Sequence, residues 1–365
     1  MGNHSQTVSR LFYRPDSDAA CDLLTTWWNG GDIGRPAMQI TARRAEPIED
    51  IPALPKPEGW STNCSTRSFK YRVNLAARWC IHTHYLGEAL PTVSPDLGAN
   101  CLALYLGCTG ADGEDTVWFE PCITDPATAR YELDPDNFYW DFTLRLAQEQ
   151  LRLGAGKFLT SFPDLIEGLD TLAAMRATQP LLTDLIERPN WVQESLRQIT
   201  DRYFKVYDIL YEMIKDERGG SYFWAWAPGR LAKLQCDFSA MISPGMFAEF
   251  MAPVLCAMTE RLDYCIYHWD GPGAIRHHDQ LLAIPGITMI QWTPGAGAEP
   301  MTHPRWWPLY HKTVEAGKKV MLTEFDPASL PVFKREFGSK FKQFMISLEV
   351  ATTEKATDLL RSAED

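Results

Sequence analysis

The spacing of apolar and polar positions along this chain changes several times between a helical and a strand-like period. The clearest helical pattern covers residues 191–217, where apolar side chains recur every three or four positions. Asn190 precedes it as a capping residue, and Gly219-Gly220 follows it as a stop. A second helix is predicted from Ser243-Pro244, a capping serine with proline at the first helical position, and a third over residues 304–317.

Short apolar runs rich in β-branched and aromatic residues lie between these helical patterns. They predict eight strands, over residues 101–106, 116–119, 157–161, 221–226, 234–238, 265–268, 288–291 and 319–323. Alternation of strands with helices is typical of an α/β protein with a parallel sheet, and eight such strands favour a (β/α)8 TIM barrel. A doubly wound open sheet is the alternative architecture.

Residues 1–75 have a different composition, with a tryptophan pair, several prolines and a single short strand expected over residues 37–42. We interpret them as an N-terminal helix and strand extension that packs on a barrel formed by residues 76–365.

Charge and composition narrow the range of partners. The chain has 365 residues and a formal net charge of −12, which argues against nucleic acid or an anionic membrane as a partner. The sequence contains no run of about 18 apolar residues, so no transmembrane helix is expected. Nine cysteines without a C-x-x-C motif predict a reduced, cytoplasmic protein without a disulfide framework.

Polar side chains at the ends of the predicted strands are the candidates for chemistry. His268 and Asp270 lie two positions apart at the end of strand 265–268 and therefore share one face, just before a Gly-Pro-Gly turn. Active sites of parallel barrels form at this end of the strands. The candidate catalytic residues are Asp237, His268, Asp270 and Glu324, and the candidate substrate-binding residues are Trp226, Gln235, Gln291 and Trp292.

A metal site is one interpretation of His268, Asp270 and Glu324, because zinc accepts imidazole nitrogen and carboxylate oxygen. The other interpretation is structural: His268 donates to a carbonyl, Asp270 caps the next helix and Glu324 pairs with a lysine. Cys80, His82 and His84 are also spaced like ligands if they lie in a strand, whereas in a helix the two histidines would diverge. The motifs of nucleotide-binding P-loops, of dinucleotide-binding folds and of α/β-hydrolases do not occur.

Four segments together resemble the uroporphyrinogen decarboxylase superfamily. They are Pro163-Asp164-Leu165 and residues 234–244, 267–273 and 284–295. The resemblance covers roughly residues 150–350 and implies a (β/α)8 barrel. One branch decarboxylates porphyrinogens and carries an N-terminal Arg-Gln-x-Gly-Arg segment for substrate carboxylates. This chain has no such segment, so the resemblance to that branch is weaker.

The other branch transfers methyl groups to or from a cobamide and binds zinc through a His-x-Cys pair and a later cysteine. Here His268 matches, while Asp270 and Glu324 would replace the cysteines. Oxygen ligands would make zinc a better Lewis acid toward oxygen, which favours a methyl ether or alcohol over a thiol. The D-x-H-x-x-G pattern of cobamide-binding domains does not occur, so the cobamide would arrive on a corrinoid partner protein.

The resemblance therefore implies a cobamide-linked methyltransferase of one-carbon metabolism that acts on a small methyl donor or acceptor. Two alternatives stay open: a metal-free decarboxylase or lyase of the same superfamily, and a carrier that binds a tetrapyrrole or cobamide without catalysis.

Overall fold

A seven-stranded, mostly parallel sheet forms the centre of the molecule. The computed structural model describes residues 6–114 and 116–364. The strand order is β2 (Thr83–Gly87), β1 (Ala37–Arg43), β13 (Phe344–Val350), β12 (Lys319–Leu322), β11 (Met289–Thr293), β10 (Tyr264–Asp270) and β9 (Leu231–Gln235). All neighbours pair in parallel except β1 and β2, which are antiparallel at one edge.

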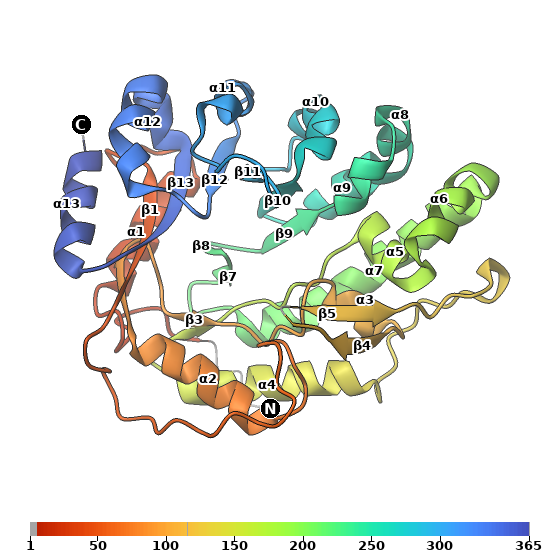
Figure 1. Cartoon of the computed structure of the whole chain (residues 1–365), viewed down its shortest axis with the longest axis horizontal. Coiled ribbons are helices and arrows are strands. Elements are labelled where there is room, and N and C mark those ends of the chain that lie inside the picture. The colour runs from red at the N-terminus through yellow and green to blue at the C-terminus, as the bar shows by residue number, and fades with distance from the viewer. Residues whose placement is uncertain (1–5, 115, 365) are drawn as a thin grey trace.

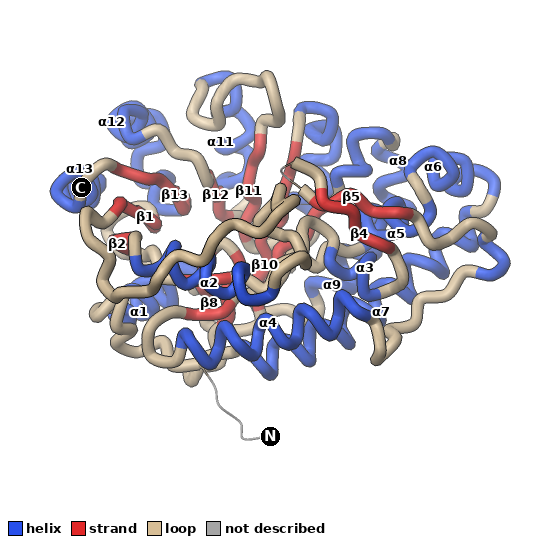
Figure 2. Tube along the Cα trace, turned by 60° about the horizontal axis from the view of Figure 1, so that its bottom comes forward, coloured by secondary structure: helices blue, strands red, loops and turns tan. Residues whose placement is uncertain are grey.

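Helices lie before, between and after these strands along the chain. They are α1 (Ser17–Trp28), α2 (Phe69–Ile81), α3 (Cys101–Tyr105), α4 (Phe138–Gly154), α5 (Gly168–Arg176), α6 (Thr178–Glu187), α7 (Pro189–Ile214), α8 (Pro244–Met246), α9 (Ala252–Thr259), α10 (His278–Ala283), α11 (Trp307–Glu315), α12 (Leu330–Phe337) and α13 (Thr353–Ala363). Figure 1 shows α9 to α13 following one another around the curved sheet, each after a parallel strand. Helices α2 and α4 lie side by side on the opposite flank (Figure 2), where the rings of Phe69 and Phe142 are 5.7 Å apart.

Three short ladders lie outside the main sheet. They are β3 (Thr92–Val93) with β6 (Leu159–Thr160) in parallel, and two antiparallel hairpins, β4 (Thr109–Asp112) with β5 (Val117–Glu120) and β7 (Ser221–Phe223) with β8 (Ala225–Ala227). Within the described residues no ladder joins either edge of the main sheet to β3 or β6. The fold is therefore a mixed α/β architecture with a curved, mostly parallel sheet, and the expected barrel is present only as this open ladder.

Single hydrogen bonds nevertheless connect the pieces around the gap. The backbone nitrogen of Phe162, just after β6, donates to the carbonyl oxygen of Tyr222 in β7 at 3.1 Å. The nitrogen of Leu231, at the start of β9, donates to the hydroxyl oxygen of Ser221 in β7 at 3.1 Å. Segments β6, β7 and β9 therefore follow one another along this edge without a continuous ladder.

Several predicted strands differ from the prediction in type or in position. Residues 101–106 were expected to form a strand, but they form α3, and this prediction is wrong. Every residue of α3 is buried, so the run lacks the alternation that distinguishes a strand from a helix. Residues 116–119 do form strand β5, but in a separate hairpin. The strand β13 was not predicted at all.

The strand predicted at residues 37–42 forms, but it lies inside the main sheet and not in a separate extension. It is β1, which pairs in parallel with β13 inside the main sheet. The stretch 1–75 therefore contributes a sheet strand as well as α1. The division of the chain at residue 75 stays a prediction.

The predicted helices form close to their expected bounds. The pattern over residues 191–217 is α7, whose apolar stripe is buried. The hydroxyl oxygen of Ser243 accepts a hydrogen bond from the backbone nitrogen of Met246 at 3.2 Å, which confirms the predicted cap. The third pattern forms a short 3-10 turn at Pro304–Trp306, followed by α11.

Candidate functional site

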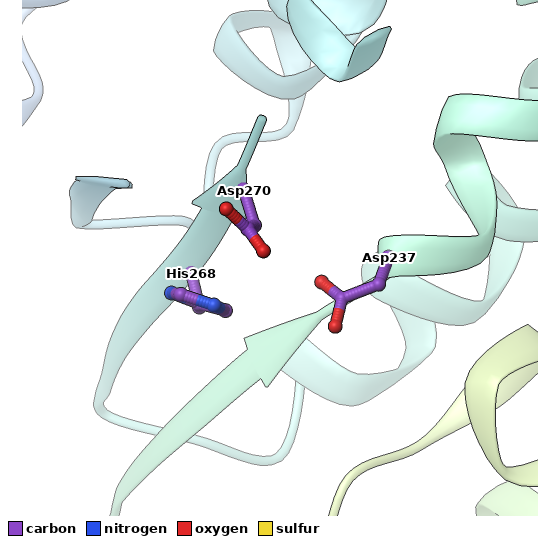
Figure 3. A group of neighbouring side chains, drawn as sticks. All are labelled: Asp237, His268 and Asp270. Atoms are coloured by element: carbon purple, nitrogen blue, oxygen red, sulfur yellow. The ribbon is translucent and has the colours of Figure 1, made fainter. Parts of the chain in front are cut away.

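Three side chains converge where β9 and β10 end. Asp237, His268 and Asp270 each offer a ligand atom, and these atoms all lie within 4.8 Å of one another. His268 and Asp270 occupy alternate positions of β10, so they project from the same face, while Asp237 begins the 3-10 turn Asp237–Met241 that follows β9. Figure 3 shows the three side chains pointing toward one another from neighbouring strands.

The strand register explains why His268 is held firmly. It pairs with Gln235 of β9 on one side and with Gln291 of β11 on the other, so three polar side chains form a row across the sheet. The amide nitrogen of Gln291 donates to the hydroxyl oxygen of Thr293 at 2.9 Å, so its amide oxygen faces the imidazole and accepts from Nδ1 of His268. Nε2 of His268 is then left with its lone pair, as metal-binding or proton-accepting histidines require.

The surroundings of His268 favour the neutral form of its imidazole. Burial lowers its pKa, and the charge of Lys233 lowers it further. A neutral imidazole is the form that binds a metal ion.

Asp237 is a carboxyl group with an unusual proton affinity. Its pKa is raised to about 7, first by desolvation of the carboxyl group among the surrounding protein atoms, although part of the residue is exposed, and then by repulsion from Asp170 and Asp270. The amide nitrogen of Gln235 donates to Oδ2 of Asp237 at 3.0 Å and holds the carboxyl group in place. At neutral pH this carboxyl group can therefore either give up or take a proton.

Lys233 is the main positive charge beneath this group. Its ammonium contacts Oδ1 of Asp164 at 2.5 Å, and its side chain is almost fully buried in β9. Two further carboxyl groups lie nearby: Glu167 accepts from the backbone nitrogen of Gln235 at 2.9 Å, and Asp170 accepts from that of Asp237 at 2.8 Å. Burial raises the pKa of both Glu167 and Asp170, while the charge of Lys233 opposes the rise.

One oxygen of Asp270 is a vacant acceptor. Oδ1 is buried and finds no hydrogen-bond donor among the residues that the structure describes. A buried carboxylate oxygen without a donor is costly, and a metal ion or a proton would satisfy it. The set of one imidazole and two carboxylates suits zinc and other divalent ions, so these residues fit a metal.

A cavity of about 880 Å³ adjoins His268, and a second cavity of about 740 Å³ shares part of its wall with the first one. The larger one is lined by His268, Gln291 and Glu324 among others, so the two ends of the predicted metal set face one cavity. Glu324 is exposed on that cavity and does not belong to the close group, in which Asp237 lies near His268 and Asp270 instead. The smaller cavity carries Arg43, Arg72 and Arg78.

The two predicted tryptophans lie in the interior and not in the larger cavity. Nε1 of Trp226 donates to Oδ2 of Asp216 at 2.6 Å, and Trp292 packs edge-to-face on Trp269. Trp224 lines the cavity instead, with its ring 5.4 Å from that of His268. Gln235 positions Asp237 and does not line the cavity.

Sequence reasoning missed Lys233 and Asp170. Lys233 had a signal, because a lysine inside an apolar strand, in step with Gln235 and Asp237, is expected only where a counter-charge meets it. The second predicted ligand set does not assemble: Cys80 lies in α2 and His84 in β2, with His82 at the junction.

Similarities to known proteins concern the fold. No protein-family model and no curated protein matches this chain. A solved structure of a methyltransferase from Methanosarcina mazei is similar, with a TM-score of 0.56 and 10% sequence identity over 95% of this chain and 98% of that chain. None of the described helices combines the length and apolar character needed to span a bilayer.

Proposed function

We propose that this protein is a methyltransferase that moves a methyl group between a small substrate and a cobamide carried by a corrinoid partner protein. The observation that carries the proposal is the convergence of Asp237, His268 and Asp270 beside a large cavity at the carboxyl ends of the strands. The similarity in fold to the Methanosarcina mazei methyltransferase supports the reaction class, and the resemblance noted in the sequence supports the cobamide.

Zinc is the proposed metal, held by His268, Asp270 and Asp237. Glu324, first expected as the third ligand, is assigned instead to the cavity wall, where it can reach a substrate. Bound there, zinc would supply Lewis acidity to an oxygen of the substrate, which suits a methyl ether or alcohol. Gln291 orients the imidazole, and Gln235 orients the carboxyl group of Asp237.

Asp237 is the proposed proton-handling group. Without a metal, its pKa of about 7 would let it protonate a leaving oxygen or accept the proton of an incoming alcohol at neutral pH. As a zinc ligand it would be deprotonated and would take no part in proton transfer. Its carboxyl group is held by Gln235 on one side and faces Asp270 on the other.

Two measurements test the proposal. Protein purified without chelator is expected to contain about one zinc ion per chain, and His268→Ala is expected to lose it; the unaltered protein without any stoichiometric divalent metal would contradict the metal site. With cob(I)alamin as a probe, a methyl donor is expected to convert the cob(I) spectrum to that of methylcobalamin. Gln193→Ala, on the exposed face of α7, is a matched control that should retain both properties.

A metal-free lyase is the second candidate, because a carboxyl group with a pKa of about 7 can serve as a general acid by itself. It would release carbon dioxide from a carboxylated substrate without zinc and leave the cob(I)alamin spectrum unchanged. A carrier would bind the pigment and do neither.

A further inference from the structure

The larger cavity has a one-sided charge. Three carboxylates, of Glu324, Asp326 and Glu349, line it. Among the residues that the structure describes, no lysine or arginine does so. A cavity with one sign of charge and low-dielectric walls attracts ligands of the opposite sign.

Aromatic side chains make up much of the remaining wall. They are Trp79, Tyr85, Phe162, Tyr222, Phe223, Trp224 and Phe325. The rings of Phe223 and Trp224 are 5.2 Å apart and tilted by 56°, so they form a corner of the wall and not a flat stack. Aromatic rings present a negative face, and several of them around one space are the usual receptor for alkylammonium groups.

Trp224 is placed in this wall by an uncommon backbone conformation. Its φ of 58° lies in the left-handed region, where bulky side chains are rare. At the turn between β7 and β8, this conformation directs the indole toward His268, at 5.4 Å between ring centroids. The indole therefore forms the part of the cavity wall next to His268.

The faces of Phe223 and Trp224 already interact with one cation. The ammonium of Lys233 lies 5.5 Å from the centroid of Phe223 and 5.8 Å from that of Trp224. Asp164 neutralises this ammonium through an ion pair at 2.5 Å, and Lys233 does not line the cavity. The net charge that a ligand meets in the cavity is therefore negative.

The arginines of this region lie in the smaller cavity. Arg43, Arg72 and Arg78 line it, and it shares Thr41, Trp79, Thr92, Val93, Ser94 and Glu349 with the larger cavity. An anionic ligand would therefore be drawn to the arginines and away from His268. A ligand beside His268 meets carboxylates and aromatic rings.

We propose that the larger cavity binds an organic cation, and that the substrate carries an alkylammonium group between Trp224, Phe223 and the carboxylates of Glu324, Asp326 and Glu349. The cation-binding property follows from the cavity alone. Only its role as part of the substrate rests on the proposed function: the oxygen-bearing end of the molecule would lie at His268 and the ammonium end against the aromatic wall.

Calorimetry with two probes of nearly the same shape tests this. Choline carries a quaternary nitrogen, and 3,3-dimethyl-1-butanol has carbon in its place. Choline is expected to bind at least about tenfold more tightly, since a desolvated cation on aromatic faces gains roughly that factor. Equal affinities for the two probes, or no binding of choline at millimolar concentration, would overturn the proposal.

Variants locate the site. Trp224→Leu is expected to weaken choline about tenfold while changing the affinity of the neutral alcohol less than twofold. Asp326→Asn removes a charge and retains the oxygen that accepts from the backbone nitrogen of Ala328 at 3.0 Å, so its fold is preserved. It is expected to weaken choline about threefold. Trp118→Leu, at an exposed position on β5, is the control and should leave both affinities unchanged.

The outcomes separate this inference from the proposed methyl transfer. Choline binding is measured on the purified protein without cobamide, both with and without added zinc. Tight choline binding with no change in the cob(I)alamin spectrum would support the cation site and contradict the methyltransferase. Methyl transfer without any preference for choline over the neutral alcohol would do the reverse.

Discussion

Replacing Lys233 with methionine should destabilise the protein because the carboxyl groups beneath the site depend on this one ammonium. Lys233 is 4% exposed, and its ammonium pairs with Asp164, whose side chain is 18% exposed. Methionine fills a similar volume without charge, so the variant isolates the electrostatic part. Removing one partner of a buried ion pair costs about 3–5 kcal/mol, because the other charge is left uncompensated. Since Asp164 keeps some contact with water, we expect about 3 kcal/mol in the free energy of unfolding.

The pH dependence of this loss has a definite sign. Lys233 lowers the pKa of Glu167, Asp170 and Asp237, yet all three remain above the ordinary carboxyl value, with Asp237 at about 7. A carboxyl group whose pKa is raised by folding stabilises the folded state fully below its unfolded pKa of roughly 4, and this contribution is lost as the pH rises through the folded value. Near pH 5 Asp237 is protonated and gains nothing from the lysine. The stability difference between the wild type and Lys233→Met should therefore be larger at pH 8 than at pH 5.

Urea denaturation at both pH values measures the difference. The double variant Lys233→Met, Asp164→Leu should be less destabilised than the sum of the two single variants, because it leaves no unpaired charge. Asp208→Asn, which weakens the partly exposed ion pairs of Asp208 with Arg230 and Arg261, is a control that should cost less than about 1 kcal/mol. A loss below about 1 kcal/mol for Lys233→Met, or an equal loss at both pH values, would refute the electrostatic account.

Three further predictions address the metal, the fold and the thiols. Zinc affinity, measured by competition with a chromophoric chelator, should rise about tenfold per pH unit below pH 7, because Asp237 must lose its proton to bind the metal. The variant Asp237→Asn should show a smaller rise with pH. Equal slopes for the variant and the wild type would contradict the role of Asp237. Gly87→Ala should lower the free energy of unfolding by at least about 2 kcal/mol. Gly87 has a φ of 61°, and a Cβ at this position would overlap a backbone oxygen of β1. An unchanged midpoint of urea denaturation would contradict this prediction. Iodoacetamide should label Cys122 before the buried cysteines, because Cys122 is exposed and a hydrogen bond from the thiol of Cys108 lowers its pKa. Peptide mass spectra that show the buried cysteines modified first would contradict this prediction.

The parts of the fold that could be predicted from sequence are those with a clear period. The long amphipathic stripe of α7 and the strands β10, β11 and β12 occur at their expected positions. The segment Cys101–Tyr105 could not be assigned, because burial on every side removes the alternation that distinguishes a helix from a strand. The pairing of β1 with β13 joins the two ends of the chain, and no local pattern contains that information.

The candidate site likewise has features that could be predicted from the sequence and features that could not. His268 and Asp270 share a face because they are two positions apart in one strand, so their proximity could be predicted locally. Whether Asp237 or Glu324 joins them depends on how the loops after β9 and β12 fold, and the structure brings Asp237 close. The tryptophan that reaches the cavity is Trp224 and not Trp226, because a left-handed residue at the hairpin turn alters which side chain faces His268.

Burial is the first cause of the raised pKa of Asp237, and repulsion from Asp170 and Asp270 raises it further. The unsatisfied oxygen of Asp270 belongs to the same group of carboxyl groups. Folding brings Asp170, Asp237 and Asp270 together at the strand ends, while the nearest ammonium, that of Lys233, is already paired with Asp164. Such a group holds more negative charge than its surroundings stabilise, and it must bind a proton or a divalent cation to relieve the repulsion. A proton occupies Asp237 as the pH falls below about 7, and the proposed metal ion would have to displace this proton. The same excess of negative charge that would recruit a metal at His268 therefore also keeps a transferable proton at Asp237, so metal binding and acid–base chemistry at this site are two states of a single charge balance.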